Sequence, residues 1–376
     1  MLFRPSSRHA RIQILLSTAT LLSFCALSLI AADAPRAFPL WDGKESIESY
    51  AARVNMPATK NIDLGGGVTL DLVLIPAGQF IMGSAEPAKP TLTVANSNWL
   101  IGIGGGAAAL LLLVLIVTCI KKRKLSVSLR WLLLMTIATG LCIGGIARRS
   151  LAIKEAARYE SELAVYISLP ANEKPAHSVT LTQPFYMGKY TVTQAQYEAV
   201  MGRNPSWFKG ATLPVTNASW NDATQFCKKL NGILDDKTRE VRLPSEAQWE
   251  YTCRAGTQTR FYSGDLDSDL DAMGWFDSNS GGKMHPVGQK KPNAFGLYDM
   301  HGNVWQWCED SYVDHYETNE TTNPVNERGG HRVTRGGSWN INTERCRASY
   351  RDDNSPFSMH TDLSFRVVVV PKSTTP

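Results

Sequence analysis

The sequence of 376 residues predicts an α+β fold that is rich in loops. Short helical patterns begin at residues with capping side chains, and they alternate with short apolar runs that are typical of strands. Long stretches between them are rich in glycine, asparagine and aromatic residues. Two uncharged apolar segments interrupt this pattern between residues 85 and 172, and they predict an inserted two-helix transmembrane hairpin.

Composition and charge are those of an ordinary folded protein, and the length allows about two domains. The formal net charge is +5, but much of the basic excess lies beside apolar segments. No basic stripe with interleaved aromatic residues is present, so we expect no nucleic-acid partner.

Residues 1–34 have the layout of a secretory signal peptide. Basic residues precede an apolar run over 12–30, and small residues follow up to Ala34, near which cleavage is expected. An uncleaved N-terminal anchor is the alternative. Residues 35–61 then resemble a linker that leads into the first folded strand.

The first strand of the folded domain is expected within residues 62–84. Val68 to Met82 alternates between apolar and polar residues and then becomes apolar before a Gly-Ser turn at Gly83. The pattern of a folded domain resumes only at Glu173 and continues to residue 371.

The segment 85–172 is therefore interpreted as an insertion with transmembrane helices at about 99–120 and 129–147. The loop 121–130 between them is rich in lysine and arginine, which predicts a cytoplasmic loop and an extracytoplasmic folded domain. A chain that crosses the membrane twice returns to the side that it left. The segments before and after residues 85–172 can therefore form one hydrophobic core. A buried pair of core helices is the alternative.

Three helices are predicted after residue 173. The first begins at Thr193 with Gln196 three positions later, and the third begins at Ser245 with Gln248, which are capping-box patterns. The second follows Ser219, where apolar residues recur at helical spacing in Ala223, Phe226, Cys227 and Leu230.

Three ordered motifs carry a family resemblance: RLPSEAQWEYTCRAG at 242–256, NAFGLYDMHGNVWQWCED at 293–310, and GGSW at 336–339 followed by SFRVV at 364–368. They resemble the formylglycine-generating enzyme, or sulfatase-modifying factor, family. The resemblance implies a C-type-lectin-like α+β fold. With the signal peptide, the layout is that of a bacterial membrane-tethered domain.

The chemistry that the resemblance implies uses a pair of thiolates that bind Cu(I), with O2 as oxidant. The two cysteines follow the Gly-Gly-Ser-aromatic motif, at positions that here hold Ile341 and Cys346. One thiolate is a poor substitute for two at a Cu(I) site. We therefore predict a non-catalytic binding or scaffolding module. A formylglycine-generating oxidase with Cys346 as catalytic residue is one alternative, and an oxidative reaction of the non-haem iron type is another.

The resemblance also implies two kinds of stabilising site. It pairs Cys253 with Cys346 in a disulfide, while buried free thiols are the alternative. It further implies a structural calcium site formed by Asp299, Gly302, Val304 and Gln306, with a weaker second position at Asn279. The alternative to calcium is a turn that carries two core tryptophans.

A ligand groove is expected beside the GGSW motif, where the resemblance implies Ser338, Trp339 and Arg351 as lining residues. An aromatic side chain with an arginine suits a peptide, a protein segment or a small acidic ligand. A core role for Trp339 and a loop ion pair for Arg351 form the alternative.

Overall fold

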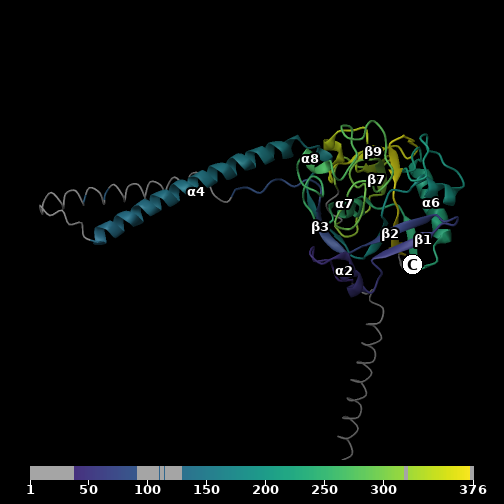
Figure 1. The fold of residues 1–376 in the computed structure, drawn as a ribbon, viewed down its shortest axis with the longest axis horizontal. Helices are drawn as coiled ribbons and strands as arrows, with labels where there is room; N and C mark the ends of the chain where they lie inside the picture. Colours follow the sequence, from purple (N-terminus) through teal and green to yellow (C-terminus); the bar gives the residue numbers. More distant parts are fainter. Residues whose placement is uncertain (1–37, 91–109, 111–113, 115–128, 317–320, 373–376) are drawn as a thin grey trace, which may run out of the picture.

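The protein is described from a computed structural model that covers residues 38–90, 110, 114, 129–316 and 321–372. A globular part contains the sheets and most of the helices, and one long helix, α4 (Leu129–Ser168), projects away from it (Figure 1). The predicted signal peptide, 1–34, lies outside the described residues.

A five-stranded antiparallel sheet forms the base of the globular part. Its strands lie in the order β1 (Thr59–Asp63), β2 (Thr69–Ile75), β5 (Phe185–Gly188), β11 (Val368–Pro371) and β6 (Arg239–Arg242). Met187 of β5 is opposite Val73 on one side and Val368 on the other. The sheet therefore unites segments from before and after the insertion.

Two smaller sheets complete the strands. One has the order β10 (Leu363–Phe365), β7 (Trp305–Ser311), β8 (Arg332–Arg335) and β9 (Asp352–Asn354), with β10 and β7 parallel. The other pairs β3 (Gly78–Met82) with β4 (His177–Leu181) across the insertion. The predicted strand over 68–82 is thus two strands, which belong to different sheets.

The three predicted helices are confirmed as α5 (Gln194–Met201), α6 (Trp220–Ile233) and α7 (Glu246–Arg254). Each begins after its predicted N-cap residue, and each has a complete capping box. The four apolar residues predicted for α6 are its buried face. Three shorter helices are α8 (Asp267–Leu270), η1 (Ala171–Glu173) and η2 (Thr343–Cys346).

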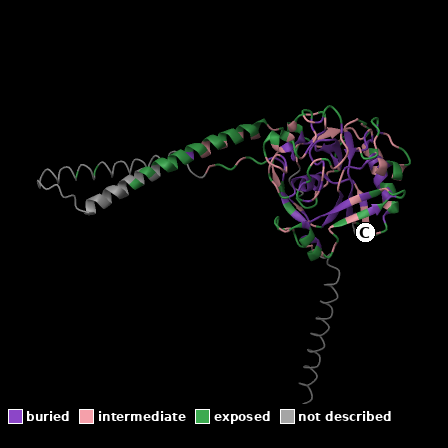
Figure 2. Ribbon diagram, in the orientation of Figure 1, coloured by how far each residue is buried: buried purple, intermediate pink, exposed green. Residues whose placement is uncertain are grey.

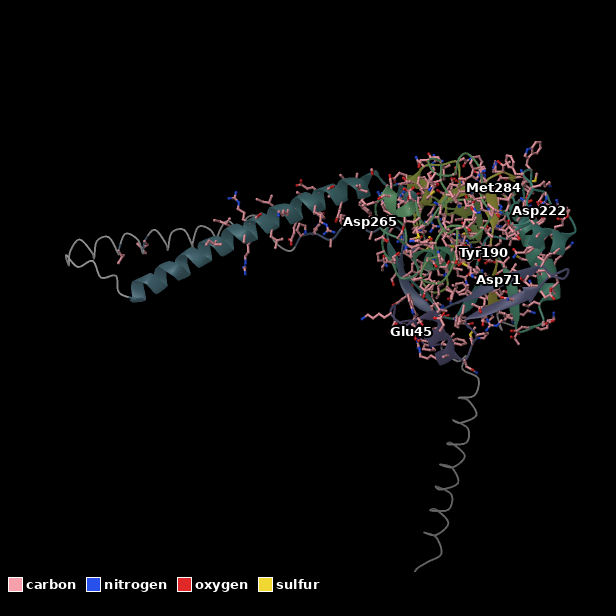
Figure 3. The ribbon with its side chains drawn as sticks, in the orientation of Figure 1. Glu45, Asp71, Tyr190, Asp222, Asp265 and Met284 are labelled. Carbon is pink, nitrogen blue, oxygen red and sulfur yellow. The ribbon has the colours of Figure 1, made fainter. Side chains whose placement is uncertain are left out.

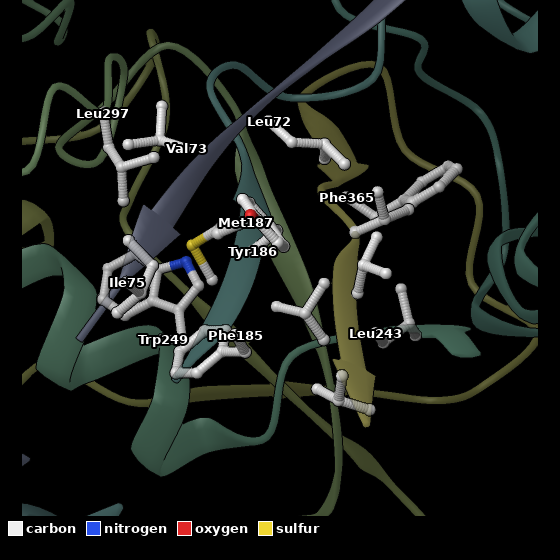
Figure 4. Close-up of a cluster of buried hydrophobic side chains, with 14 of the residues drawn as sticks. Leu72, Val73, Ile75, Phe185, Tyr186, Met187, Leu243, Trp249, Leu297 and Phe365 are labelled. Atoms are coloured by element: carbon white, nitrogen blue, oxygen red, sulfur yellow. The ribbon is translucent and has the colours of Figure 1, made fainter. Parts of the chain in front are cut away.

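The core fills the space between the large sheet and α7. Trp249 of α7 is fully buried and packs near Phe185 and Ile75 of the sheet (Figure 4). Burial is concentrated in the globular part, whereas the described half of α4 is exposed along most of its length (Figure 2). Apolar burial in one continuous cluster is the main favourable contribution to folding.

The segment 35–61 is more than a linker. It contains β1 and the helix α2 (Ile47–Val54), whose Tyr50 is fully buried. The hydroxyl group of Tyr50 donates to Pro39 O and accepts from Ala77 N, so the helix is fixed on the sheet. The sequence did not reveal this contact because Ile47, Tyr50 and Ala51 make only a short apolar face.

The predicted localisation, with two transmembrane helices, is wrong. Within the described ranges, no helix has both the length and the apolar character needed to cross a membrane. The predicted second span at 129–147 is part of α4, which continues to Ser168 through a charged half that includes Arg148, Arg149 and Lys154. Most of the predicted first span, 99–120, and most of the loop 121–130 lie outside the described residues.

The two ends of the 85–172 segment meet at one buried ionic cluster. Ser84 N donates to Glu173 O at 2.9 Å, and Ser84 Oγ donates to the Glu173 carboxylate at 3.0 Å. Both carboxylate oxygens of Glu173 accept from Arg347, at 2.5 and 2.7 Å, and Ser349 Oγ adds a contact at 2.8 Å. The chain therefore leaves and re-enters the globular part at the same point.

Candidate functional site

The GGSW turn positions the residues expected to carry chemistry. Gly336 and Gly337 follow β8 with φ values of 96° and 78°, a backbone region that favours glycine. A Cβ on Gly337 would lie 2.6 Å from Cys346 Sγ and 3.0 Å from Arg345 O. Gly337 thus allows η2, which ends at Cys346, to pack directly under the turn.

Cys346 is fully buried beneath this turn. Its side chain belongs to a small apolar cluster with Phe261, Leu270 and Phe276, against which the partly buried Ile341 packs. Burial raises the pKa of the Cys346 thiol well above its ordinary value. The group is therefore a protonated thiol at neutral pH.

The predicted disulfide between Cys253 and Cys346 is not formed in the structure, where both are free thiols. His301 lies beside both residues. Its Nδ1 is 2.7 Å from Cys346 O, and its Nε2 is 3.7 Å from Cys253 Sγ. Because Tyr262 N donates to Nε2 at 3.1 Å, Nδ1 carries the proton that is donated to Cys346 O.

His301 lies within the motif at 293–310, and the sequence predicts no role for it. Burial lowers its pKa to about 4, so the imidazole is neutral, and burial raises the pKa of Cys253 to about 12. A neutral histidine that contacts the protonated Cys253 thiol and the backbone oxygen of Cys346 is a packing arrangement. It contains no thiolate for a soft metal ion.

These residues do not fit Cu(I). The first thiol position is occupied by Ile341, which has no donor atom, and the second thiol is enclosed in the apolar cluster with a raised pKa. The copper chemistry that the resemblance implies requires two adjacent thiolates. Within the described part of the chain, no group of three or more His, Cys, Asp and Glu residues is arranged to hold a metal ion.

The predicted groove residues have different surroundings in the structure. Ser338 is buried, and its hydroxyl group donates to Asn340 Oδ1 at 2.6 Å and to Asp362 Oδ2 at 3.0 Å. Trp339 follows it and is partly exposed. Arg351 is instead buried in an ion pair with Glu246, in which Nε and Nη2 donate at 2.6 and 2.8 Å.

Arg351 belongs to a buried ionic network that sequence reasoning missed. Glu246 also lies 3.4 Å from Arg335, and Arg335 donates to Glu250, which accepts from Arg254 as well. The remaining donor of Arg351, Nη1, contacts the backbone oxygens of Asn172 and Val313. Each of the three nitrogen atoms of Arg351 therefore makes at least one of these contacts, which hold the guanidinium group within the protein.

The predicted calcium ligands lie on one turn, where the side chain of Gln306 is already engaged. Gln306 Oε1 accepts from Trp249 Nε1 at 2.8 Å and from Arg366 Nε at 2.7 Å. Gln306 Nε2 donates to Asp299 O. The guanidinium group of Arg366 therefore faces the oxygen that a calcium ion would need.

Asp299 has one carboxylate oxygen on Gly288 N, and the other has no partner in the described structure. Burial raises its pKa to about 6. Calcium takes six to eight oxygen ligands, and one free carboxylate oxygen beside a guanidinium group does not provide them. Gln306 therefore does not fit the role of a calcium ligand in this arrangement, and the calcium site stays a prediction.

Asn279, the weaker metal position, closes a turn. Its Oδ1 accepts from Phe276 N at 2.8 Å, and its Nδ2 donates to Gly274 O at 3.0 Å. The side-chain amide thus replaces backbone hydrogen bonds of the loop. Nothing in these contacts indicates a metal ligand.

An exposed apolar surface, which the sequence did not predict, lies on two loops. Its four side chains are 77%, 51%, 73% and 59% exposed, and we call them the apolar surface: Trp207, Phe208, Phe357 and Met359. Asn217 joins the loops, because its Oδ1 accepts from Trp207 N at 3.1 Å and its N donates to His360 O at 2.9 Å. This contact between residues far apart in the sequence joins the two loops.

Comparison with known proteins identifies the relatives of the chain. The sulfatase-modifying factor enzyme 1-like domain matches residues 156–370. A chaperone protein, LppX, from Paenibacillus barcinonensis is 30% identical, over 51% of this chain and 81% of that protein. The formylglycine-generating enzyme of Mus musculus is 31% identical, over 50% of this chain and 52% of the enzyme. That of Thermomonospora curvata is 26% identical, over 80% and 93%.

Two solved structures have a similar fold. Treponema denticola variable protein 1 has a TM-score of 0.57 at 24% identity, over 83% of this chain and 99% of that one. PvdO from Pseudomonas aeruginosa has a TM-score of 0.53 at 20% identity, over 82% and 97%. With the family match over more than half of the chain, this protein belongs to the sulfatase-modifying factor enzyme 1-like domain family.

Proposed function

We propose that this chain is a non-catalytic binding module of its family and that its ligand is an extended or unfolded polypeptide segment. The observation that carries the proposal is the apolar surface. Trp207 and Phe357 are each more than 70% exposed. Large apolar side chains gathered on a protein surface mark interaction sites, and aromatic anchors dominate binding energies.

Local hydrogen bonds support the idea that this surface is prearranged. Phe208 O accepts from Gln194 Nε2 at 2.8 Å, and the turn that carries Phe357 is closed by Ser358 N donating to Ser355 O. A prearranged surface loses less conformational entropy on binding. The chaperone relative supports a polypeptide as ligand, since the chain covers most of that protein.

The chemistry around Cys346 supports a non-catalytic role. Ile341 offers no thiolate, and the Cys346 thiol is protonated and enclosed. An oxidase that needs a Cu(I)–dithiolate centre would lack the ligand at the Ile341 position in this arrangement. Neither the formylglycine-generating reaction nor an iron-dependent oxidation gains support from the described residues.

The test is binding of a permanently unfolded polypeptide, reduced and carboxymethylated α-lactalbumin carrying a fluorescent label, to the full-length protein. We expect saturable binding, followed by fluorescence anisotropy. Trp207→Ser and Phe357→Ser should each weaken it about tenfold or more, because a central aromatic anchor contributes about 2 kcal/mol.

Leu266→Ser is the matched control. Leu266 is 66% exposed, but it adjoins Asp265 near α8. Asp265 and Asp222 of α6 lie at opposite edges of the globular part (Figure 3), and the loop with Trp207 precedes α6. Equal binding by wild type and Trp207→Ser, or an equal loss in Leu266→Ser, would contradict the proposal.

A second arm tests the enzymatic alternative. The protein is incubated with Cu(I), O2 and a peptide that contains a Cys-x-Pro-x-Arg motif, and the peptide cysteine is followed by mass spectrometry. We expect an unchanged peptide. Conversion to formylglycine that is lost in Cys346→Ala would overturn the non-catalytic assignment.

A further inference from the structure

A cavity of about 270 Å³ lies apart from both the GGSW turn and the apolar surface. It opens beside the start of α7, the end of β7 and the segment after Pro324. Its wall combines buried charged groups with apolar and aromatic side chains, including Met82, Glu246, Ala247, Asp310, Tyr316 and Val325. Polypeptide binding at the apolar surface makes no use of this cavity.

Asp310, at the base of the cavity, is a buried carboxylate without a counter-ion. It is 5% exposed, and its two oxygens accept only backbone hydrogen bonds, from Asn326 N at 2.9 Å and Glu246 N at 2.7 Å. Within the described structure, no Lys, Arg or His forms an ion pair with it. Buried charges in proteins are ordinarily paired.

The other buried carboxylates of the ionic network show the usual arrangement. Glu173 is paired with Arg347, Glu246 with Arg351, and Glu250 with Arg335 and Arg254. The bidentate contact of Arg351 with Glu246 leaves neither of these two charges for a ligand. Of the two buried carboxylates in the cavity wall, Glu246 and Asp310, Asp310 is thus the one without a cationic partner among the described residues.

The rest of the wall suits an alkyl chain with a polar end. The hydroxyl group of Tyr316 is buried and has no hydrogen-bond partner in the part of the chain described. The Tyr316 ring is flanked by Arg351, at 4.3 Å from its centroid, and by His177, at 4.9 Å between centroids. Met82, Ala247 and Val325 provide an apolar surface for methylene groups.

We propose that this cavity binds a primary ammonium group on a short alkyl chain, with the Asp310 carboxylate as its counter-ion and the Tyr316 hydroxyl as a second acceptor. Ammonium carries a positive charge and three donors but no acceptor, which suits a wall that offers a carboxylate without a counter-ion and a hydroxyl oxygen without a hydrogen-bond partner. The size of the cavity fits one such chain, either as a free amine or as a lysine side chain of a partner protein.

The protonation of Asp310 agrees with a missing cation. Burial, followed by the charge of Glu246, raises its pKa to about 7 in the unliganded protein. A bound ammonium group favours the ionised form, so binding should release protons and strengthen as pH rises from 6 to 8. The charged and titratable groups that face this carboxylate or line the cavity are Glu246, Glu309, His177, Tyr316, Glu327, Arg328 and Arg351.

The experiment is calorimetric titration of the full-length protein with n-butylammonium chloride, with n-butanol as the uncharged control. We expect saturable one-to-one binding of the amine alone, and a heat that depends on the ionisation enthalpy of the buffer at pH 7. Asp310→Asn should weaken binding at least about tenfold, because a hydrogen bond to a charged group is lost. Asp314→Asn, a change at an exposed carboxylate nearby, should leave the affinity unchanged.

A second variant guards against misfolding of Asp310→Asn. Val325→Phe keeps the carboxylate and fills the cavity from its half-buried loop position, and it should abolish binding while the circular dichroism spectrum stays native. A lysine-containing peptide and its norleucine analogue then separate the two sources of the amine. Absence of saturable binding by both butylammonium and the lysine peptide, or equal affinity in Val325→Phe, would overturn the proposal.

Discussion

The ionic cluster at Glu173 should be a major contributor to stability. Both Glu173 and Arg347 are buried, with side chains 0% and 3% exposed, and two hydrogen bonds join them. Glu173→Ala leaves the guanidinium group without this carboxylate and removes an acceptor from Ser84 and Ser349. Removing one partner of a buried ion pair lowers the free energy of unfolding by about 3–5 kcal/mol.

Equilibrium urea unfolding of the full-length protein measures this loss. With an m-value of about 3 kcal/mol per molar urea, the midpoint should fall by roughly 1 to 1.7 M. Glu344→Gln is the matched control, because Glu344 also pairs with Arg347, at 3.2 Å, but its side chain is 57% exposed. Exposed pairs contribute at most about 1 kcal/mol.

The double variant Glu173→Ala/Arg347→Met completes the test. If the cost arises from an uncompensated buried charge, removing Arg347 as well should recover part of the lost stability. Equal midpoints for Glu173→Ala and Glu344→Gln would refute the reasoning. The reasoning would also be refuted if the double variant were less stable than Glu173→Ala by a further full loss, as expected when two effects are independent.

Three further predictions concern the glycine turn, the buried Asp310 and the calcium position. Gly337→Ala should destabilise the protein by more than about 2 kcal/mol in urea unfolding, since its φ is 78° and the new Cβ would meet Cys346 Sγ at 2.6 Å; Gly282→Ala, with φ of 72° and open space, is the control. Burial raises the pKa of Asp310 to about 7 in the folded protein, whereas the unfolded chain loses this proton near pH 4. The contribution of the protonated group to the free energy of unfolding is therefore fully present below pH 4 and is lost as pH rises to 7. The free energy of unfolding of Asp310→Asn, relative to that of wild type, should therefore increase by up to about 1.4 kcal/mol per pH unit between pH 4 and pH 7. A difference in stability that does not change with pH would contradict the burial argument. Because Gln306 Oε1 already accepts from two donors, excess EDTA or calcium should leave the thermal midpoint unchanged, and a calcium-dependent rise would restore the predicted site.

Local sequence determined the helices and the family. The N-caps of α5, α6 and α7 were predictable because each capping box lies within four residues, where side-chain and backbone groups meet without help from the fold. The motifs at 242–256 and 293–310 identified the family for the same reason, since they are contiguous in sequence. The replacement of an expected thiol by Ile341 is likewise a property of the sequence alone.

The tertiary structure decided what the polar groups do. Arg351 was predicted to line a groove, but its partner Glu246 lies 105 residues away, and Gln306 was predicted to bind calcium, but Arg366 lies 60 residues away. The apolar surface likewise depends on Asn217 joining two loops from distant parts of the chain. Local patterns carry no information about such distant partners, and in this chain those partners determine which charges are satisfied and which, as at Asp310, remain open to a ligand.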